Sequence, residues 1–121
     1  MHPMAFQITT VQTFCASHQL RLYHGDLEPL HGHNWRVRLT VSAAGLDSIG
    51  VVMDFHKLDR LLGSVLKELD NHHLNDVLPT NPSAENVAAH VASRLVLPRR
   101  VNLVSVEVWE TPENSACYLP G

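Results

Sequence analysis

Residues 30–41 have the sequence Leu30-His31-Gly32-His33-Asn34-Trp35-Arg36-Val37-Arg38-Leu39-Thr40-Val41, which alternates between two kinds of side chain. One set contains His31, His33, Trp35, Val37, Leu39 and Val41, and the other contains Asn34, Arg36, Arg38 and Thr40. Because successive side chains of a β-strand point to opposite faces of the sheet, this alternation predicts a strand with one apolar face. Two imidazoles then point the same way at the rim of that face, where they can chelate one metal ion.

A third histidine is expected beside this pair. Residues 5–18 also predict a strand, with Phe6, Ile8, Phe14, Ala16 and His18 on one face and His18 at its far end. Three histidines from two neighbouring strands leave a fourth coordination position open, which is typical of catalytic rather than structural zinc sites. The simpler alternative is a chance His-x-His pair in a chain that contains nine histidines. The position of His18 favours the metal site.

The composition indicates one globular domain, residues 1–121, with enough apolar residues for a core. A net charge of −3 argues against a nucleic-acid partner, which would need a basic surface. No apolar run approaches the ~20 residues of a membrane span, and the N-terminus lacks the pattern of a signal peptide. We therefore expect a cytoplasmic protein with no membrane partner. Cys15 and Cys117 form no Cys-x-x-Cys motif and are expected to be inert buried thiols.

Two helices are expected in the middle of the chain. Asp54 can cap a helix that ends near Asp70, because apolar residues recur at helical spacing through residues 55–69. Asn81 is the expected N-cap of a second helix, with Pro82 at the first helical position. The inward face of this helix would carry Ala84, Val87, Ala88, Val91 and Leu95.

Alternation returns in residues 101–111, which place Val104, Val106, Val108 and Glu110 on one face, and residues 115–119 can form an edge strand. The predicted order is β-β-α-α-β-β, and the predicted class is α+β: a four-stranded antiparallel sheet with two helices on one face. The uncovered edges of such a sheet favour pairing with another subunit, so a homo-oligomer is expected.

Six short motifs occur in a fixed order along the chain. They are Phe14-Cys15-Ala16-Ser17-His18, His31-Gly32-His33-Asn34, Val52-Met53-Asp54-Phe55, Leu69-Asp70 to Leu74-Asn75, Asn81-Pro82-Ser83-Ala84-Glu85-Asn86 and Trp109-Glu110-Thr111. With these motifs the chain resembles the 6-pyruvoyltetrahydropterin synthase and 6-carboxytetrahydropterin synthase family over nearly its whole length. The resemblance implies the tunnelling fold, with trimers that pair into hexamers and active sites at subunit interfaces. It also implies zinc as cofactor and 7,8-dihydroneopterin triphosphate as the pterin substrate.

The same resemblance implies roles for individual residues. His18, His31 and His33 correspond to the zinc ligands. The substrate-binding positions correspond to Glu110, which would anchor the pterin ring, and to Ser83, Ala84, Glu85 and, across the subunit interface, Asp54 and Phe55. Each position has a structural alternative. Glu110 could pair with an arginine, Ser83 could cap a helix as well as bind the pterin, and Phe55 is favoured as a core aromatic residue.

The sequence departs from the family where the catalytic base is expected. The family has a cysteine four residues before the His-Gly-His motif, and this chain has Leu27, which cannot carry a proton. Glu28 gives the pattern Glu-x-x-His-Gly-His, which resembles a subgroup in which glutamate replaces the cysteine. A carboxylate can act as a general base. The alternative is a solvated loop carboxylate.

A second departure lies at the proton relay. The family has Asp-His where this chain has Asp70-Asn71, and asparagine cannot shuttle a proton at neutral pH. Asp70 is kept as a catalytic candidate. His72 is a candidate replacement, although a shift of one residue near a helix end turns a side chain by about 100°. His73 is expected at the surface.

These features predict a zinc-dependent pterin lyase, of the glutamate type that releases 6-hydroxymethyl-dihydropterin by cleaving the substrate side chain. One alternative is elimination of triphosphate to form 6-pyruvoyl- or 6-carboxytetrahydropterin, the latter for deazapurine (queuosine) synthesis. A second is a non-catalytic paralogue that binds zinc and pterin, which the loss of both the cysteine and the relay histidine favours. A third is a metal-storage protein, which would leave Glu110 and residues 83–86 unexplained.

Overall fold

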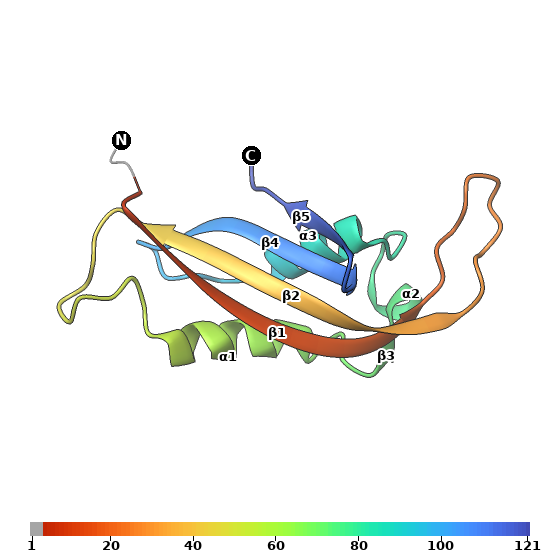
Figure 1. Ribbon diagram of the computed structural model, residues 1–121, viewed down its shortest axis with the longest axis horizontal. Helices are drawn as coiled ribbons and strands as arrows, with labels where there is room; N and C mark the ends of the chain where they lie inside the picture. Colours follow the sequence, from red (N-terminus) through yellow and green to blue (C-terminus); the bar gives the residue numbers. More distant parts are fainter. Residues whose placement is uncertain (1–3) are drawn as a thin grey trace.

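The computed structural model describes residues 4–121 and contains one twisted sheet with helices packed against one of its faces (Figure 1). In chain order the elements are β1 (Phe6–His18), β2 (His31–Ala43), α1 (Phe55–Leu66), β3 (His72–His73), α2 (Leu74–Val77), α3 (Ala84–Arg94), β4 (Asn102–Thr111) and β5 (Asn114–Tyr118). The long strands come first and last with the helices between them, so the predicted α+β class is confirmed.

The sheet has the strand order β3-β1-β2-β4-β5, which is one strand more than the sequence predicted. The four longer strands pair antiparallel as expected, whereas the two residues of β3 pair parallel with Ala16 and Ser17 of β1. The prediction of a purely antiparallel, four-stranded sheet was therefore wrong at this edge. A two-residue strand has no alternation to detect, and the four-residue helix α2 was missed for the same reason.

The core lies between the sheet and helices α1 and α3. The alternation predicted for β2 is confirmed, because Trp35, Val37 and Leu39 are fully buried. The helices contribute Leu58, Leu62, Val65, Leu66, Val87, Ala88 and Val91. Each buried Leu or Val side chain contributes about 1.5–3 kcal/mol, so the layer holds the strands firmly in register. Phe55 is 55% exposed, and its assignment to the core was wrong. As the first residue of α1 it lines a surface groove with Phe6.

The helix termini were predicted in part. Asp54 caps α1 as expected, with its carboxylate accepting from the His56 N–H at 2.9 Å. The N-cap of α3 is Ser83 rather than Asn81, because the Asn81 side chain is hydrogen-bonded to the backbone of Arg21 instead. Within residues 4–121 no helix has both the length and the apolar character needed to cross a bilayer.

Candidate metal centre and active site

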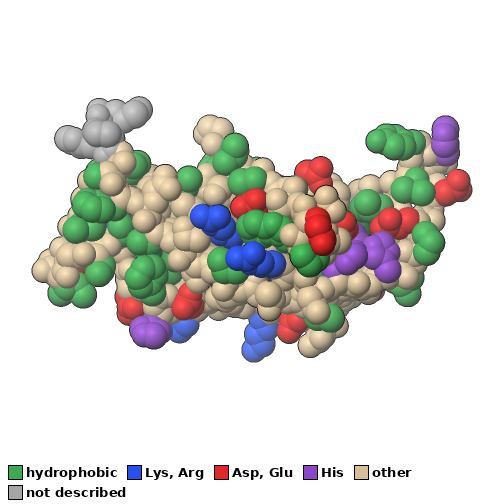
Figure 2. Space-filling model, viewed as in Figure 1, with side chains coloured by type: hydrophobic (Ala, Val, Ile, Leu, Met, Phe, Trp, Pro, Cys, Tyr) green, Lys and Arg blue, Asp and Glu red, His purple; other side chains and the backbone are tan. Residues whose placement is uncertain are grey.

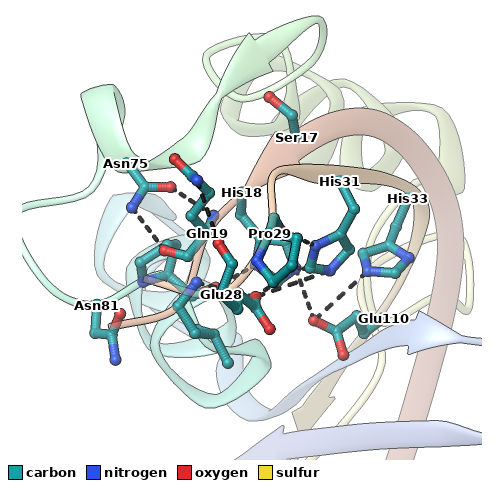
Figure 3. A network of polar contacts seen from close by, with 12 residues as sticks. Ser17, His18, Gln19, Glu28, Pro29, His31, His33, Asn75, Asn81 and Glu110 are labelled. Atoms are coloured by element: carbon teal, nitrogen blue, oxygen red, sulfur yellow. Dashed lines mark hydrogen bonds and ion pairs between the residues drawn. The ribbon is translucent and has the colours of Figure 1, made fainter. Parts of the chain in front are cut away.

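The β1–β2 hairpin brings the three predicted histidines together. His18 and His31 are directly opposite each other in the antiparallel register, and His33 follows two residues further along the same face of β2. Glu110 comes from β4, the other neighbour of β2. One side-chain atom from each of these four residues lies within 4.8 Å of the others (Figure 3). We call this group the histidine–glutamate cluster.

Hydrogen bonds to backbone carbonyls fix which ring nitrogens face the cluster. His18 donates from Nδ1 to the carbonyl of Pro82 at 2.8 Å, and His31 donates from Nδ1 to the carbonyl of Pro29 at 2.8 Å. In the neutral tautomers that these bonds select, each Nε2 carries a lone pair. Contacts of this kind orient histidine ligands in metal sites.

The contacts inside the cluster join acceptors to acceptors. His18 Nε2 lies 3.0 Å from His31 Nε2 and 2.9 Å from Glu110 Oε1. Neither neutral histidine has a proton to place between these atoms, because each uses its N–H on a carbonyl. Lone pairs at this distance repel unless a cation lies among them. The geometry therefore fits a bound metal ion.

His33 supports the same conclusion independently. Its Nε2 is buried and has no hydrogen-bond partner among the described residues, which is costly unless another group satisfies it. Burial lowers the pKa of His33 below its ordinary value of 6.5, against the opposing effect of the Glu110 carboxylate. The neutral imidazole that results is the form that binds metals. The donor set of three nitrogens and one oxygen suits a transition-metal ion.

Glu110 faces the cluster and not an arginine. In the described part of the chain its ionisable neighbours are the imidazoles of His18 and His33, and His33 Nε2 lies 3.8 Å from Glu110 Oε1. The alternative of an arginine salt bridge is not what the structure shows. Figure 2 shows histidine side chains gathered beside acidic ones at one end of the visible face, whereas the central part of that face carries Lys and Arg.

A cavity of about 190 Å³ adjoins the cluster at Glu110. It is lined by Leu20, Ser83, Ala84, Glu85, Glu110, Asn114, Ser115 and Ala116. Four of the predicted substrate-binding residues therefore share one cavity. Ser83 also caps α3 by accepting from the Asn86 N–H at 3.1 Å, so its two expected roles are compatible. Sequence analysis missed Leu20 and residues 114–116, because their place depends on a loop path and on the register of β4 with β5.

Glu28 is the predicted catalytic residue that the structure brings to the cluster. Its Oε1 lies 3.9 Å from His18 Nε2 and 3.8 Å from His31 Nε2, and its side chain is 23% exposed. Leu27 beside it points outward and is 52% exposed. Both cysteines are exposed, so their predicted burial was wrong. Cys15 lies an odd number of residues from His18 on β1, on the face away from the cluster.

Asp70 and His72 contact the outer edge of β1 instead of the cluster. Asp70 accepts the Cys15 N–H at 2.9 Å, and Asn71, with a φ of 60°, donates its N–H to the Cys15 carbonyl at 2.6 Å. His72 is exposed and donates from Nδ1 to the Asp70 carbonyl at 2.8 Å. His73 was expected at the surface but is half-buried. Asp54 caps α1 and does not line the cavity beside Glu110.

Comparison with known proteins accounts for this arrangement. The family model described as 6-pyruvoyl tetrahydropterin synthase matches residues 7–120. A dihydroneopterin monophosphate aldolase of Pyrococcus furiosus is 36% identical over 103 residues, covering 84% of this chain and 86% of the relative. A 6-carboxy-5,6,7,8-tetrahydropterin synthase of Synechocystis is 38% identical over 112 residues, covering 88% and 87%.

The fold is also shared with a solved structure. The 6-pyruvoyl tetrahydropterin synthase of Caenorhabditis elegans superposes with a TM-score of 0.79 at 24% identity, covering 99% of this chain and 98% of that one. The architecture is thus the tunnelling fold. With its three-histidine, one-glutamate metal site, this chain belongs to the 6-pyruvoyl tetrahydropterin synthase family of pterin-metabolising enzymes.

Proposed function

We propose that the protein is a zinc-dependent lyase that cleaves the side chain of a phosphorylated 7,8-dihydroneopterin and releases 6-hydroxymethyl-7,8-dihydropterin. The observation that carries this proposal is the position of Glu28, whose carboxylate lies within 3.9 Å of two ligand nitrogens while both cysteines are exposed. The similarity to a relative named dihydroneopterin monophosphate aldolase supports an aldol cleavage. The substrate would be the triphosphate or the monophosphate.

His18, His31 and His33 would hold the zinc ion, with Nε2 atoms already directed at one point. Bound there, zinc would act as a Lewis acid that polarises the side-chain hydroxyls of the substrate. Glu110 would accept the pterin amino and ring N–H donors, with Ser83, Ala84 and Glu85 lining the same cavity. A pterin bound in this way would have its side chain between the cavity and Glu28, where orientation would lower the barrier.

The chemical step needs one base and one returned proton. Glu28 would accept the proton of the 2′ hydroxyl, so that C2′ becomes an aldehyde carbon as the C1′–C2′ bond breaks. The bonding electron pair passes to C1′ and into the conjugated C6=N5 bond of the dihydropterin. A proton returned to C1′ gives 6-hydroxymethyl-7,8-dihydropterin, and the other two carbons leave as phosphorylated glycolaldehyde. Atoms and electrons balance without a redox partner.

Asp70, His72 and Asp54 remain proposed site residues that act only in an assembled homo-oligomer. Within one protomer they contact the edge of β1 or the start of α1, and none lines the cavity beside Glu110. A trimer or a dimer of trimers would allow a neighbouring protomer to bring them to the pterin. Light scattering on the purified protein would measure this assembly.

The test is to incubate the zinc-loaded protein with the triphosphate and the monophosphate of 7,8-dihydroneopterin and to identify products by mass spectrometry. We expect 6-hydroxymethyl-7,8-dihydropterin, and we expect Glu28→Gln to lower kcat by about 10²–10⁴-fold because it removes the general base. Asp26→Asn, which changes an exposed carboxylate of the same loop, is the matched control and should leave kcat unchanged. Full activity of Glu28→Gln would exclude Glu28 as the base.

A second candidate is 6-carboxytetrahydropterin synthase activity, which the 38% identity to the Synechocystis enzyme favours. The same product analysis separates the two reactions. Each product keeps one side-chain carbon on C6, as a carboxylate in the first case and as a hydroxymethyl group after aldol cleavage. Pterin binding without turnover would instead indicate a non-catalytic paralogue.

A further inference from the structure

Residues 19–21, which lead out of β1, are held along one edge by two asparagine side chains. The Gln19 N–H donates to Asn75 Oδ1 at 2.9 Å, and Asn75 Nδ2 donates to the Gln19 carbonyl at 2.7 Å. Two residues further on, the Arg21 N–H donates to Asn81 Oδ1 at 2.8 Å, and Asn81 Nδ2 donates to the Arg21 carbonyl at 3.0 Å. Each amide therefore pairs with the backbone as a residue of a neighbouring strand would.

The opposite edge of the same segment holds Glu28. The Leu20 N–H donates to Glu28 Oε1 at 2.9 Å, and the Glu28 N–H donates to the Leu20 carbonyl at 2.9 Å. Gln19 Nε2 also donates to the Glu28 carbonyl at 3.2 Å. In an extended chain adjacent residues direct their N–H groups to opposite sides. Residues 19 and 21 thus face the asparagines, while Leu20 faces Glu28.

The two asparagines are themselves fixed. The Asn81 carbonyl accepts from Asn86 Nδ2 and from the Ser83 N–H, both at 2.8 Å, which ties it to the first turn of α3. The next residue, Pro82, accepts the His18 Nδ1–H. Asn75 belongs to α2. One segment before α3 therefore orients a metal ligand directly and the Glu28 carboxylate through Asn81 and Leu20.

We propose that Asn75 and Asn81 are positioning residues that set the Glu28 carboxylate at its place beside the histidine–glutamate cluster. This inference rests on the proposed function, in which Glu28 is the base. Removal of one of these side-chain amides takes two hydrogen bonds from the backbone of residues 19–21. The Leu20 N–H that holds Glu28 Oε1 is then less firmly positioned. A displacement of about 1 Å at a catalytic group can cost on the order of 10²-fold in rate.

The test compares Asn75→Ala and Asn81→Ala with the control Asn102→Ala, an exposed asparagine at the start of β4. We expect kcat to fall about 10- to 100-fold in the first two variants, with KM and zinc content within about twofold of the parent, and no change in the control. In a Glu28→Gln background, measured by single-turnover kinetics, the same substitutions should change the rate less than about twofold. Such non-additivity shows that the asparagines act through Glu28.

A readout independent of turnover is hydrogen exchange at the Leu20 amide, which should lose protection in both alanine variants. If Asn75→Ala does not fold, Asn75→Asp replaces it, because it keeps the acceptor and loses only the donor to Gln19. The inference is overturned if the rate loss is as large in the Glu28→Gln background, or if Leu20 protection is unchanged. Absence of any aldol product in the parent overturns the proposed function, and the exchange measurement still tests the placement of Leu20.

Discussion

His18 combines a structural and a metal-binding role in one ring. The ring is fully buried, its centroid lies 4.9 Å from that of Trp35, and its Nδ1–H satisfies the Pro82 carbonyl. The other nitrogen is left for the cluster. His31 and His33 are more exposed and depend on the β2 backbone for their position. At the scale of residues, the metal site thus consists of one fully buried histidine, His18, and two more exposed ones, His31 and His33.

Glu110 can be tested separately as a pterin anchor and as a metal ligand. In Glu110→Gln we expect zinc content to stay at the parent value and affinity for a pterin to fall about 10- to 100-fold, because one carboxylate hydrogen bond contributes about 1.5–3 kcal/mol and an amide accepts through only one atom. Elemental analysis and fluorescence titration measure the two quantities. Glu113→Gln, in the exposed β4–β5 turn, is the control. Loss of zinc would instead make Glu110 a ligand.

The metal-binding residues were predicted from the sequence because they lie on strands whose alternation is long and regular. The position of Glu28 was less accessible. The Glu-x-x-His spacing suggested the residue, but its contact with the cluster depends on a loop that Asn75 and Asn81 hold from distant parts of the chain. Leu20 carried no signal, because its contribution to the Glu28 contact is a backbone N–H.

At the scale of elements, the sequence predictions were wrong where a helix or strand is short, or where a residue near a helix end hydrogen-bonds to a distant segment instead. β3 and α2 are too short for a periodic pattern. Asn81 precedes a proline and has the chemistry of an N-cap. Its side chain is instead hydrogen-bonded to the Arg21 backbone, and Ser83 caps the helix. Long-range pairing of this kind overrides local preference, and it cannot be seen in a window of neighbouring residues.

The contribution of the loop between β2 and α1 to folding stability should depend on pH through Asp47. Its Oδ1 accepts the N–H groups of Ile49 at 3.0 Å and Val51 at 3.2 Å. The bond from Val51, then that from Ile49, lowers the pKa of Asp47 below its ordinary value of 3.8. A folded-state pKa below the unfolded one adds stability above pH 3.8, and this stability is lost as the pH falls through the folded value.

Asp47→Ala should therefore be less stable than the parent near neutral pH, and the difference should shrink as the pH falls below 3.8. Urea unfolding at a series of pH values measures it. Asp26→Ala, at an exposed loop carboxylate, should change stability little over the same range. A difference in unfolding free energy that grows as the pH falls would contradict a lowered pKa for Asp47 in the folded state.

At the scale of the whole molecule, the cluster connects strands from both ends of the chain. Its residues belong to β1, β2 and β4 and are separated by as many as 92 positions, from His18 to Glu110, and an ion held by the three histidines joins β1 to β2. An ion that binds only the folded state stabilises it by RT ln(1 + [L]/Kd), which is about 2.7 kcal/mol at a concentration 100 times Kd. The strands that meet at the cluster are then held more firmly than packing alone achieves.

Removal of the metal should lower the melting temperature by roughly 10 °C, since about 2.7 kcal/mol corresponds to a shift of this order for a domain of this size. Differential scanning calorimetry with and without a chelator measures the shift, and added Zn²⁺ should reverse it. His33→Ala lacks one ligand and should melt at the same temperature with or without the chelator. An equal shift in that variant would show that the chelator acts elsewhere.

The pairing of His18 with His31 has a practical consequence for any preparation of this protein. A one-residue slip between β1 and β2 would present Ser17 or Gln19 where His18 belongs and would turn the alternating side chains to the opposite face. Misregistered chains would then fail to take up an ion. The stoichiometry of tightly held zinc, one per correctly folded chain, becomes an assay of strand registration that needs no substrate.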